Sequence, residues 1–385
     1  GLIALCGTKR ILGKMIYKTF IAFLSTACCL LSCHHGDELG QEATNNAITF
    51  SGYVVKTKGT VADNVSSLSS MGVVAFYTGS DNFASAASPQ LFMDNVLVEK
   101  NNNVWKPTNQ IYYWPSEGKK VSFFAYSPHS SVFKSGEGVT VAPGTGAATP
   151  TLTYKVPALV ADQQDLMLAQ SPDRTSADGV VKTDLKHALS AIDIKAKVGV
   201  PIEQGSSIYL SSLRITGVCG SAIVSISDNV VWSGHSDTTS YALSTALGLK
   251  SAALTTTSER VNADNYTLMV LPQTVPRDAK LELEFEVRQN NDGTVIRTVA
   301  KSLQMTEVLK TLDVSRRYTL ILTYGTEVTV ECQVLDWKPG DDTSFDDDGS
   351  YTLSVSNREI VYMEDGVEEL TVYTDYPGEW SIFST

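Results

Sequence analysis

Residues 280–288 read KLELEFEVR, and this stretch decides the fold class. Its apolar side chains fall on every second position, at Leu281, Leu283, Phe285 and Val287. Because successive side chains of a β-strand point to opposite faces, this alternation predicts a strand with one face on a core and the other in water. Strands of this kind are typical of antiparallel sheets.

The same period returns in several other parts of the chain. Residues 318–324, 328–334 and 192–198 alternate in the same way, and 121–126 is a more continuous apolar run. Helical periodicity is scarce, and only 307–312 is expected to form a turn or two of helix. Many short strands separated by Gly-, Asn- and Asp-rich turns predict an all-β protein of sandwich or barrel type.

Length and composition limit the domain count and the class of partner. A chain of 385 residues with 43% hydrophobic residues predicts two or three domains with real cores. Its net charge of −12 argues against nucleic acid as a partner, since nucleic acid binds basic surfaces. The polar stretch 172–183 and the acidic stretch 338–349 indicate domain boundaries.

That acidic stretch echoes part of a calcium-binding EF-hand loop. However, Ser344 stands at the first ligand position and Val355 at the twelfth, where an acidic residue is needed. We therefore interpret it as a solvated linker.

The N-terminal part of the chain has the pattern of a lipoprotein signal. The apolar run 20–31 is shorter than the roughly 20 residues of a membrane span and is typical of a signal-peptide core. We take Met15 as the start of translation and 15–32 as the signal peptide. The sequence LLSC at 30–33 resembles a bacterial lipobox, which predicts cleavage before Cys33 and its lipidation with palmitate or a similar chain. An ordinary buried cysteine is the alternative.

The residues after Cys33 predict where the lipid anchor places the protein. Gly36-Asp37-Glu38 resembles the acidic export signal of Bacteroidetes lipoproteins, which implies the outer membrane with the protein facing outward. Several acyl chains on one cysteine hold a protein firmly in the membrane, because each buried CH₂ adds about 0.8 kcal/mol to the free energy of membrane binding. Residues 33–46 are then a tether. The histidines at 34 and 35 have no third ligand nearby and do not predict a metal site.

The chain lacks the sequence motifs of common enzymes. It contains no Gly-x-Ser-x-Gly elbow, no P-loop and no His-Glu-x-x-His pattern. His129, His187 and His235 lack metal-ligand spacing, so we expect neither catalysis nor a cofactor or metal. Cys219 and Cys332 are predicted to point inward from strands as buried free thiols, although a disulfide between them stays open.

Seven blocks of sequence resemble the fimbrillin-like (Mfa-like) proteins of Bacteroidetes type V pili. The blocks follow one another in the family order from about residue 48 to 337: IYYWP (111–115), KKVSFFAYSP (119–128), DLMLA (165–169), LKHALSAIDI (185–194), YTLMVLP (266–272), RYTLIL (317–322) and VLDW (334–337). The resemblance implies two tandem β-sandwich domains of transthyretin-like topology. We place them at 47–184 and 185–338, followed by an acidic linker at 339–350.

The resemblance also implies a way of assembling. In such pili a protease removes an N-terminal strand after a basic residue, and a strand from another subunit fills the exposed groove by β-augmentation. Residues 48–55 are the candidate displaceable strand here, with Ile48 and Phe50 facing the core. Lys56 and Lys58 are the candidate processing sites. Alternatively, these lysines merely cap an exposed strand end, and no arginine lies nearby for an arginine-specific protease.

The C-terminal residues 351–385 resemble the first half of a BACON module, a small sandwich common in surface proteins that contact glycans. The resemblance rests on 353–362, 370–373 and 378–382. We therefore expect a partial third β-module, and expect the chain to be a fragment. A domain after Trp337 favours a tip, anchor or stand-alone adhesin over a repeating stalk unit.

Two functional hypotheses follow. The leading one is a fimbrillin-like surface lipoprotein that serves as a pilus subunit or as a tip or anchor adhesin. Its partners would be other subunits, through strand exchange, and a glycan or protein receptor on a host or bacterial surface. The alternative is a glycan-binding surface lipoprotein that does not polymerise. Six aromatic residues are predicted to pack in the core rather than to bind sugars: Tyr112, Tyr113, Trp114, Phe123, Phe124 and Tyr126.

Overall fold

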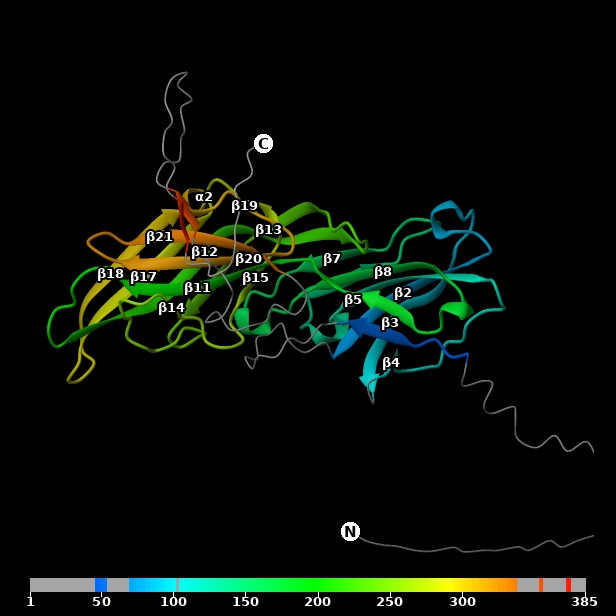
Figure 1. Cartoon of the computed structure of the whole chain (residues 1–385), viewed down its shortest axis with the longest axis horizontal. Helices are drawn as coiled ribbons and strands as arrows, with labels where there is room; N and C mark the ends of the chain where they lie inside the picture. Colours follow the sequence, from blue (N-terminus) through cyan, green and yellow to red (C-terminus); the bar gives the residue numbers. More distant parts are fainter. Residues whose placement is uncertain (1–45, 54–68, 102–103, 338–352, 356–371, 375–385) are drawn as a thin grey trace, which may run out of the picture. The chain divides into compact units, whose positions relative to one another are not determined.

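The computed structural model describes residues 46–53, 69–101 and 104–337, together with two short strands near the C-terminus (Figure 1). The two strands, β22 (Leu353–Val355) and β23 (Val372–Thr374), pair with each other in antiparallel fashion. They lie within the expected BACON-like module, whose other residues are outside the described part of the chain. Almost all regular structure consists of strands, which confirms the all-β prediction.

Helices are few and short in the described residues. Four 3₁₀ helices span three residues each: Phe83–Ser85, Ser130–Val132, Val160–Asp162 and Ser176–Asp178. Helix α2 (Met305–Val308) lies close to the turn that the sequence predicted at 307–312. The prediction placed it too late, because Thr311–Leu312 is instead strand β19, which pairs with β16 (Gln273–Thr274).

One sheet of eight strands forms the N-terminal part, in the order β10-β8-β5-β2-β3-β4-β1-β9. In chain order these strands are β1 (Phe50–Tyr53), β2 (Ser70–Gly79), β3 (Gln90–Asn101), β4 (Val104–Pro107), β5 (Lys120–Ser127), β8 (Met167–Arg174), β9 (Val181–Asp184) and β10 (Lys186–His187). Neighbouring strands are antiparallel except β1 and β9, which are parallel. The Ser171 hydroxyl of β8 donates to the Lys182 carbonyl of β9, so the sheet curls until β8 meets the end strand β9.

Strand β5 of this sheet is buried on both faces, and each face packs against a different core. Phe123 belongs to the smaller of two hydrophobic clusters, whereas Phe124 and Tyr126 belong to the larger one. All three side chains are at most 2% exposed. A strand covered on both faces needs apolar residues at every position, which explains the continuous apolar run at 121–126.

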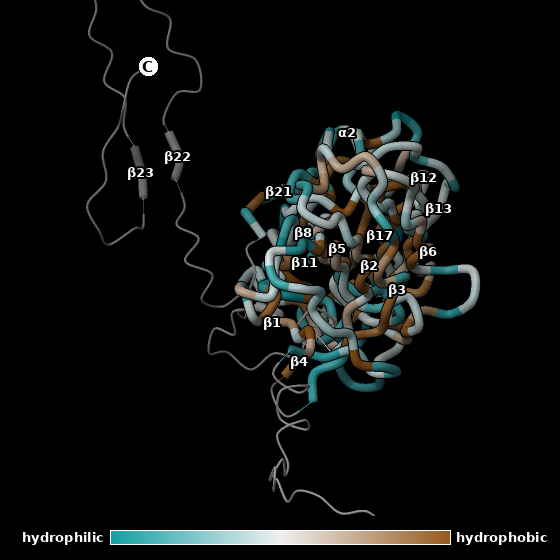
Figure 2. The backbone as a smooth tube through the Cα atoms, turned by 90° about the vertical axis from the view of Figure 1, so that its right-hand side faces the viewer, coloured by the Kyte–Doolittle hydropathy of each residue, from teal (hydrophilic) through white to brown (hydrophobic). Residues whose placement is uncertain are grey.

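Two further sheets face each other across the larger core. The first has the order β14 (Glu259–Arg260), β11 (Ser190–Val198), β20 (Arg316–Tyr324), β21 (Thr329–Asp336), with β15 (Leu268–Val270) also paired to β11. The second has the order β18 (Val295–Gln304), β17 (Lys280–Gln289), β12 (Ser206–Ser225), β7 (Thr151–Lys155), β6 (Gly138–Ala142), with β13 (Trp232–Ser244) also paired to β12. The expected inward row of β17 is buried, with Leu281 and Phe285 fully inaccessible. Figure 2 shows these apolar strand segments inside the body and hydrophilic loops around it.

The strand β12 connects segments that are far apart in the sequence. It is 20 residues long, which is enough to pair with β17 along Ser206–Thr216 and with β7 along Ser221–Ser225. Strands β6 and β7 precede the domain boundary predicted at 184 and 185, yet they share a sheet with β12. Backbone pairing therefore crosses that boundary, and the division into 47–184 and 185–338 stays a prediction.

A glutamine side chain fills the gap between β17 and β7 along the edge of β12. The Cys219 N–H donates to Gln273 Oε1 at 2.8 Å, and Gln273 Nε2 donates back to the Cys219 carbonyl at 3.1 Å. The carboxamide thus makes the two hydrogen bonds that a neighbouring peptide group would make. Because an unpaired buried backbone group is costly, this contact completes the sheet.

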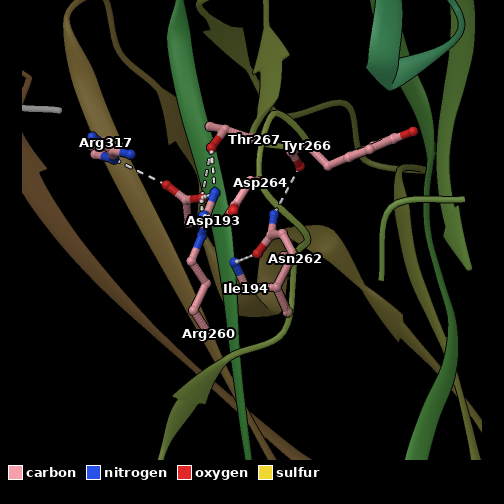
Figure 3. Close-up of polar contacts among 8 residues, drawn as sticks. All are labelled: Asp193, Ile194, Arg260, Asn262, Asp264, Tyr266, Thr267 and Arg317. Carbon is pink, nitrogen blue, oxygen red and sulfur yellow. Dashed lines mark hydrogen bonds and ion pairs between the residues drawn. The ribbon is translucent and has the colours of Figure 1, made fainter. Parts of the chain in front are cut away.

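A buried carboxylate links the strands of the first of these sheets (Figure 3). Asp193 of β11 is inaccessible to solvent. Its Oδ1 accepts from Arg260 Nη2 at 3.1 Å and from the Thr267 hydroxyl at 2.8 Å, and its Oδ2 accepts from Arg317 Nε at 3.0 Å. These contacts join β11 to β14, β20 and the residue before β15.

Removal of this charge should destabilise the protein strongly. In Asp193→Asn, two nearly buried guanidinium groups lose the buried carboxylate that they share, and breaking a buried ion pair from one side costs about 3–5 kcal/mol. We expect a clear drop in the urea midpoint at unchanged slope.

Asp264 provides a matched control for this substitution. It contacts the same Arg260 at 3.7 Å, but its side chain is 67% exposed. Asp264→Asn should therefore change the unfolding free energy by less than about 1 kcal/mol. Equal effects of the two substitutions would contradict a structural role for the buried carboxylate.

Candidate strand-exchange site

Strand β1 lies inside the eight-stranded sheet although it is the first strand of the described chain. Phe50 is opposite Trp105 of β4 in antiparallel register. On its other side β1 runs parallel to β9, from Phe50 opposite Val181 to Tyr53 opposite Asp184. Both edges of β1 are therefore paired, and β4 and β9 face each other across the space that it occupies.

The residues just before β1 are held by the IYYWP segment. The Ile48 N–H donates to the Tyr112 carbonyl at 2.8 Å, and the Trp114 N–H donates to the Asn46 carbonyl at 3.0 Å. The Asn46 side-chain amide returns a hydrogen bond to the Trp114 carbonyl at 3.1 Å. A short antiparallel bridge between Ala47 and Tyr113 completes this contact. The whole segment 46–53 is thus fixed by backbone hydrogen bonds.

The side chains of Ile48 and Phe50 close the smaller core. They are 1% and 2% exposed, which confirms that they face inward. The Phe50 ring packs edge-on against Phe123 with centroids 5.6 Å apart, and Trp114 packs against the same ring at 5.7 Å. Ile48 and Phe50 are two of the sixteen buried residues that make up the smaller hydrophobic cluster. Departure of β1 would leave an apolar groove with unpaired backbone groups on both sides.

A further set of hydrogen bonds ties β1 to β9. The Val181 N–H donates to the Thr49 carbonyl at 2.8 Å. The Thr183 hydroxyl, on a residue only 2% exposed, donates to the Ser51 carbonyl at 2.8 Å. The carbonyls of Thr49 and Ser51, two positions apart, are therefore both bonded to β9.

The other predicted site residues lie outside the described residues. These are the lipidation site Cys33, the export signal Asp37 and Glu38, and the processing sites Lys56 and Lys58. In the sequence, Lys56 follows the last residue of β1, Tyr53, by three positions. A cut at either lysine would therefore separate β1 covalently from β2. Calcium binding by the acidic linker likewise concerns residues outside the described part.

The six aromatic residues are mostly buried. Trp114, Phe123, Phe124 and Tyr126 are at most 5% exposed, which confirms the core interpretation for these four. Tyr112 is half-buried and packs against Phe92, while Tyr113 is 45% exposed. This run of aromatic residues therefore offers a single exposed ring rather than a platform for sugars.

The two cysteines of the described body are free and half-buried, not buried as expected. Cys332 lies on β21, the last strand of its sheet, so only part of its surface packs against the larger core. Burial raises the pKa of the Cys332 thiol to about 11, which keeps it protonated and unreactive at neutral pH.

A buried cluster that the sequence did not single out lies near the end of β21. Asp165 Oδ2 lies 2.6 Å from His187 Nδ1, and the His187 ring stacks on Trp337 with centroids 3.9 Å apart. The backbone N–H of Trp337 also donates to the Ser315 carbonyl at 2.8 Å. Three of the quoted blocks, DLMLA, LKHALSAIDI and VLDW, contribute one residue each. The sequence shows the order of these three blocks along the chain. That order alone does not predict that their side chains come into contact.

Within the described residues, no three His, Cys, Asp or Glu side chains are grouped so that they could hold a metal ion. None of the helices described is long and apolar enough to cross a membrane.

Comparisons with known proteins agree with this architecture. A fimbrium subunit, Fim1C of Phocaeicola vulgatus, is 27% identical over 220 residues, which cover 51% of this chain and 57% of that protein. The chain thus matches little more than half the length of this curated relative. A crystal structure of a fimbrial protein from Bacteroides vulgatus superposes with a TM-score of 0.58 at 22% identity, covering 76% of this chain and all of that one.

The family assignment rests on a broader match. The model of the fimbrillin-like family matches residues 57–337, from just after β1 to the tryptophan that stacks on His187. This span contains the larger core, the smaller core apart from Ile48 and Phe50, and the three large sheets apart from β1. The chain belongs to the fimbrillin-like family.

Proposed function

We propose that this protein is a non-catalytic cell-surface subunit of a fimbria, or an adhesin at its tip or anchor, and that it assembles by strand exchange. One observation carries the proposal: β1 is paired on both edges and fills the smaller core with two side chains, yet it joins β2 only through the segment that contains Lys56 and Lys58. A cut there would leave β1 held by noncovalent contacts alone. A strand from another subunit would then replace it.

The names of the relatives support the coarse part of this proposal, since the two matched proteins are described as a fimbrium subunit and a fimbrial protein. The finer parts are expectations from the sequence. They are the lipid on Cys33, export to the outer membrane directed by Asp37 and Glu38, and the BACON-like module at 351–385. Adhesion to a glycan or protein receptor belongs to the same set.

The first test concerns the cut. In Lys56→Gln/Lys58→Gln, a trypsin-like protease should no longer cleave after β1, and the protein should stay folded and monomeric. The unmodified mature protein should be cut there and should form larger species when a donor subunit is added. Mass spectra and size distributions of both proteins report the result. If the unmodified protein stays uncut at both lysines, or is cut and remains monomeric beside a donor, the strand-exchange proposal fails.

The second test concerns the side chains that hold β1. In cut protein, Phe50→Ala should release the N-terminal fragment at least ten times faster, because large-to-small changes of a buried phenylalanine cost about 3–5 kcal/mol. Thr49→Ala is the matched control, since the Thr49 carbonyl that pairs with β9 is retained. Native mass spectrometry of the fragment bound over time measures both rates. Equal release from the two variants would show that Phe50 does not hold the strand.

The third test concerns the anchor. Cys33→Ala should leave the signal peptide uncleaved or release the protein without lipid, because a thiol is needed for acylation. Labelling of cells with radioactive palmitate, followed by isolation of the protein, reports the outcome. Cys219→Ala serves as the control and should label normally. Labelling of Cys33→Ala at the level of the unmodified protein would refute the assignment.

A further inference from the structure

Strand β18 has one edge that faces away from β17, and this open edge has no strand partner in the described part of the chain. On its other side β18 pairs with β17 from Lys280 opposite Gln304 to Arg288 opposite Val295, and it is the last strand of that sheet. None of its ten residues is buried. The open edge therefore presents backbone N–H and C=O groups, which are a template for pairing with an added strand.

The inner face of β18 carries two positive charges. Residues directly opposite each other in paired strands share a face, so the residues opposite the core-facing row of β17 point toward the core side. They are Arg297, Val299, Lys301 and Leu303. Arg297 donates to the Tyr324 hydroxyl at 3.2 Å, but neither it nor Lys301 forms an ion pair within the described residues. A strand added at the open edge would thus meet two cations four positions apart on this face.

The inner face also has room for incoming side chains. A hollow of about 350 Å³ lies between the start of β18 and the turn from β20 to β21. Its lining includes Arg297, Val299, Tyr324 and Val328, so one guanidinium stands among mostly apolar walls. This space suits an acidic side chain that is followed, two positions on, by an apolar one.

The outer face combines small side chains of β18 with glutamates of β17. Thr298, Ala300 and Ser302 lie opposite Glu286, Glu284 and Glu282. Arg288 forms an ion pair with Glu286, and Arg214 of β12 lies opposite Glu282. Three glutamates against two arginines leave a small excess of negative charge on this face. Polar or basic side chains of an added strand would therefore be tolerated there, whereas acidic ones would not.

A second copy of β18 is a poor partner for this edge. In a symmetric antiparallel pair, the two arginines and two lysines of both inner faces would lie in one row. A register centred on Val299 would place Arg297 of one copy directly opposite Lys301 of the other. Because like charges in that position destabilise a strand pair, the edge disfavours its own copy and favours a strand of complementary charge.

We propose that the open edge of β18 binds an extended segment of another protein, in which two acidic residues four positions apart face Arg297 and Lys301. The backbone of the segment pairs with β18, and an apolar residue between the two acidic ones lies over Val299. The other face of the segment carries polar or basic residues. This surface is separate from the strand-exchange site, because β18 and β1 belong to different sheets.

Binding of two synthetic peptides of equal composition tests the proposal. The first, TVKETVKET, has glutamates four positions apart in one row, so that both face a cation in antiparallel register. The second, TETEVKVKT, has its glutamates two positions apart, so that only one of them can do so. Fluorescence polarisation should show about ten-fold tighter binding of the first peptide, because a repulsive cross-strand pair replaces an attractive one in the second. The Lys56→Gln/Lys58→Gln protein is used, which keeps β1 in place.

Two variants and a second measurement locate the binding. In Arg297→Gln/Lys301→Gln the two peptides should bind equally, whereas the matched control Lys106→Gln/Lys310→Gln, at exposed positions elsewhere, should keep the ten-fold difference. Hydrogen exchange of the unbound double variant should show unchanged protection of β17, which reports that the sheet is folded. In the parent, the first peptide should slow amide exchange within 295–304.

Four results would overturn the proposal. The first is that neither peptide binds, which would leave the two cations as protection of the edge against pairing. The second is equal binding of both peptides to the parent. The third is a ten-fold difference that persists in Arg297→Gln/Lys301→Gln. The last is slowed exchange confined to residues outside β18, including those beside β1.

Discussion

The pairing of β1 on both edges is the interaction on which the smaller core depends. The eight-stranded sheet curls until β8 and β9 meet, and β1 is the strand that bridges β4 to β9 within it. Ile48 and Phe50 supply two of the few side chains that fill this core, so closure of the sheet and filling of the core come from the same segment. We therefore expect the N-terminal part to lose stability when that segment leaves, which would link its stability to the proposed role in assembly.

The larger core depends on contacts between distant parts of the chain. Phe124 and Tyr126 belong to it and lie on the face of β5 that is opposite the smaller core. Leu152 and Tyr154 of β7 also belong to it, and most of its other residues come from the two C-terminal sheets. The hydrogen bonds between Gln273 and Cys219 and those around Asp193 satisfy polar groups at the places where this assembly of strands leaves gaps. The N-terminal and C-terminal halves therefore share a core as well as a sheet. A change in one half is transmitted to packing in the other, because close-packed interiors transmit strain.

The features that could be predicted from sequence are those that depend on local periodicity. The strand at 280–289 and the inward direction of Ile48 and Phe50 follow from a period of two residues, which any half-buried strand must obey. The pairing of β7 with β12 could not be predicted, because it depends on the length of β12 and on which edge remains open after β17 has paired. The partners of Asp193 could not be predicted either. In the alternating pattern Asp193 is on the outward face of its strand, where a residue in contact with solvent is expected. The half-burial of Cys332 has the same origin: periodicity gives the direction of a side chain but not whether a strand is the last of its sheet.

The directions of the two strands beside β1 bear on how a replacement strand would be recognised. Since β1 is antiparallel to β4 and parallel to β9, these two neighbours run in opposite directions. A strand inserted in either direction would thus be parallel to one neighbour and antiparallel to the other, and backbone hydrogen bonding alone gives little preference. The spaces that Ile48 and Phe50 occupy differ, because one holds a branched aliphatic side chain and the other an aromatic ring that packs edge-on against Phe123. Under the proposed strand exchange, we expect the side chains of an incoming strand to select its direction and register, with a large aromatic residue two positions from a branched aliphatic one.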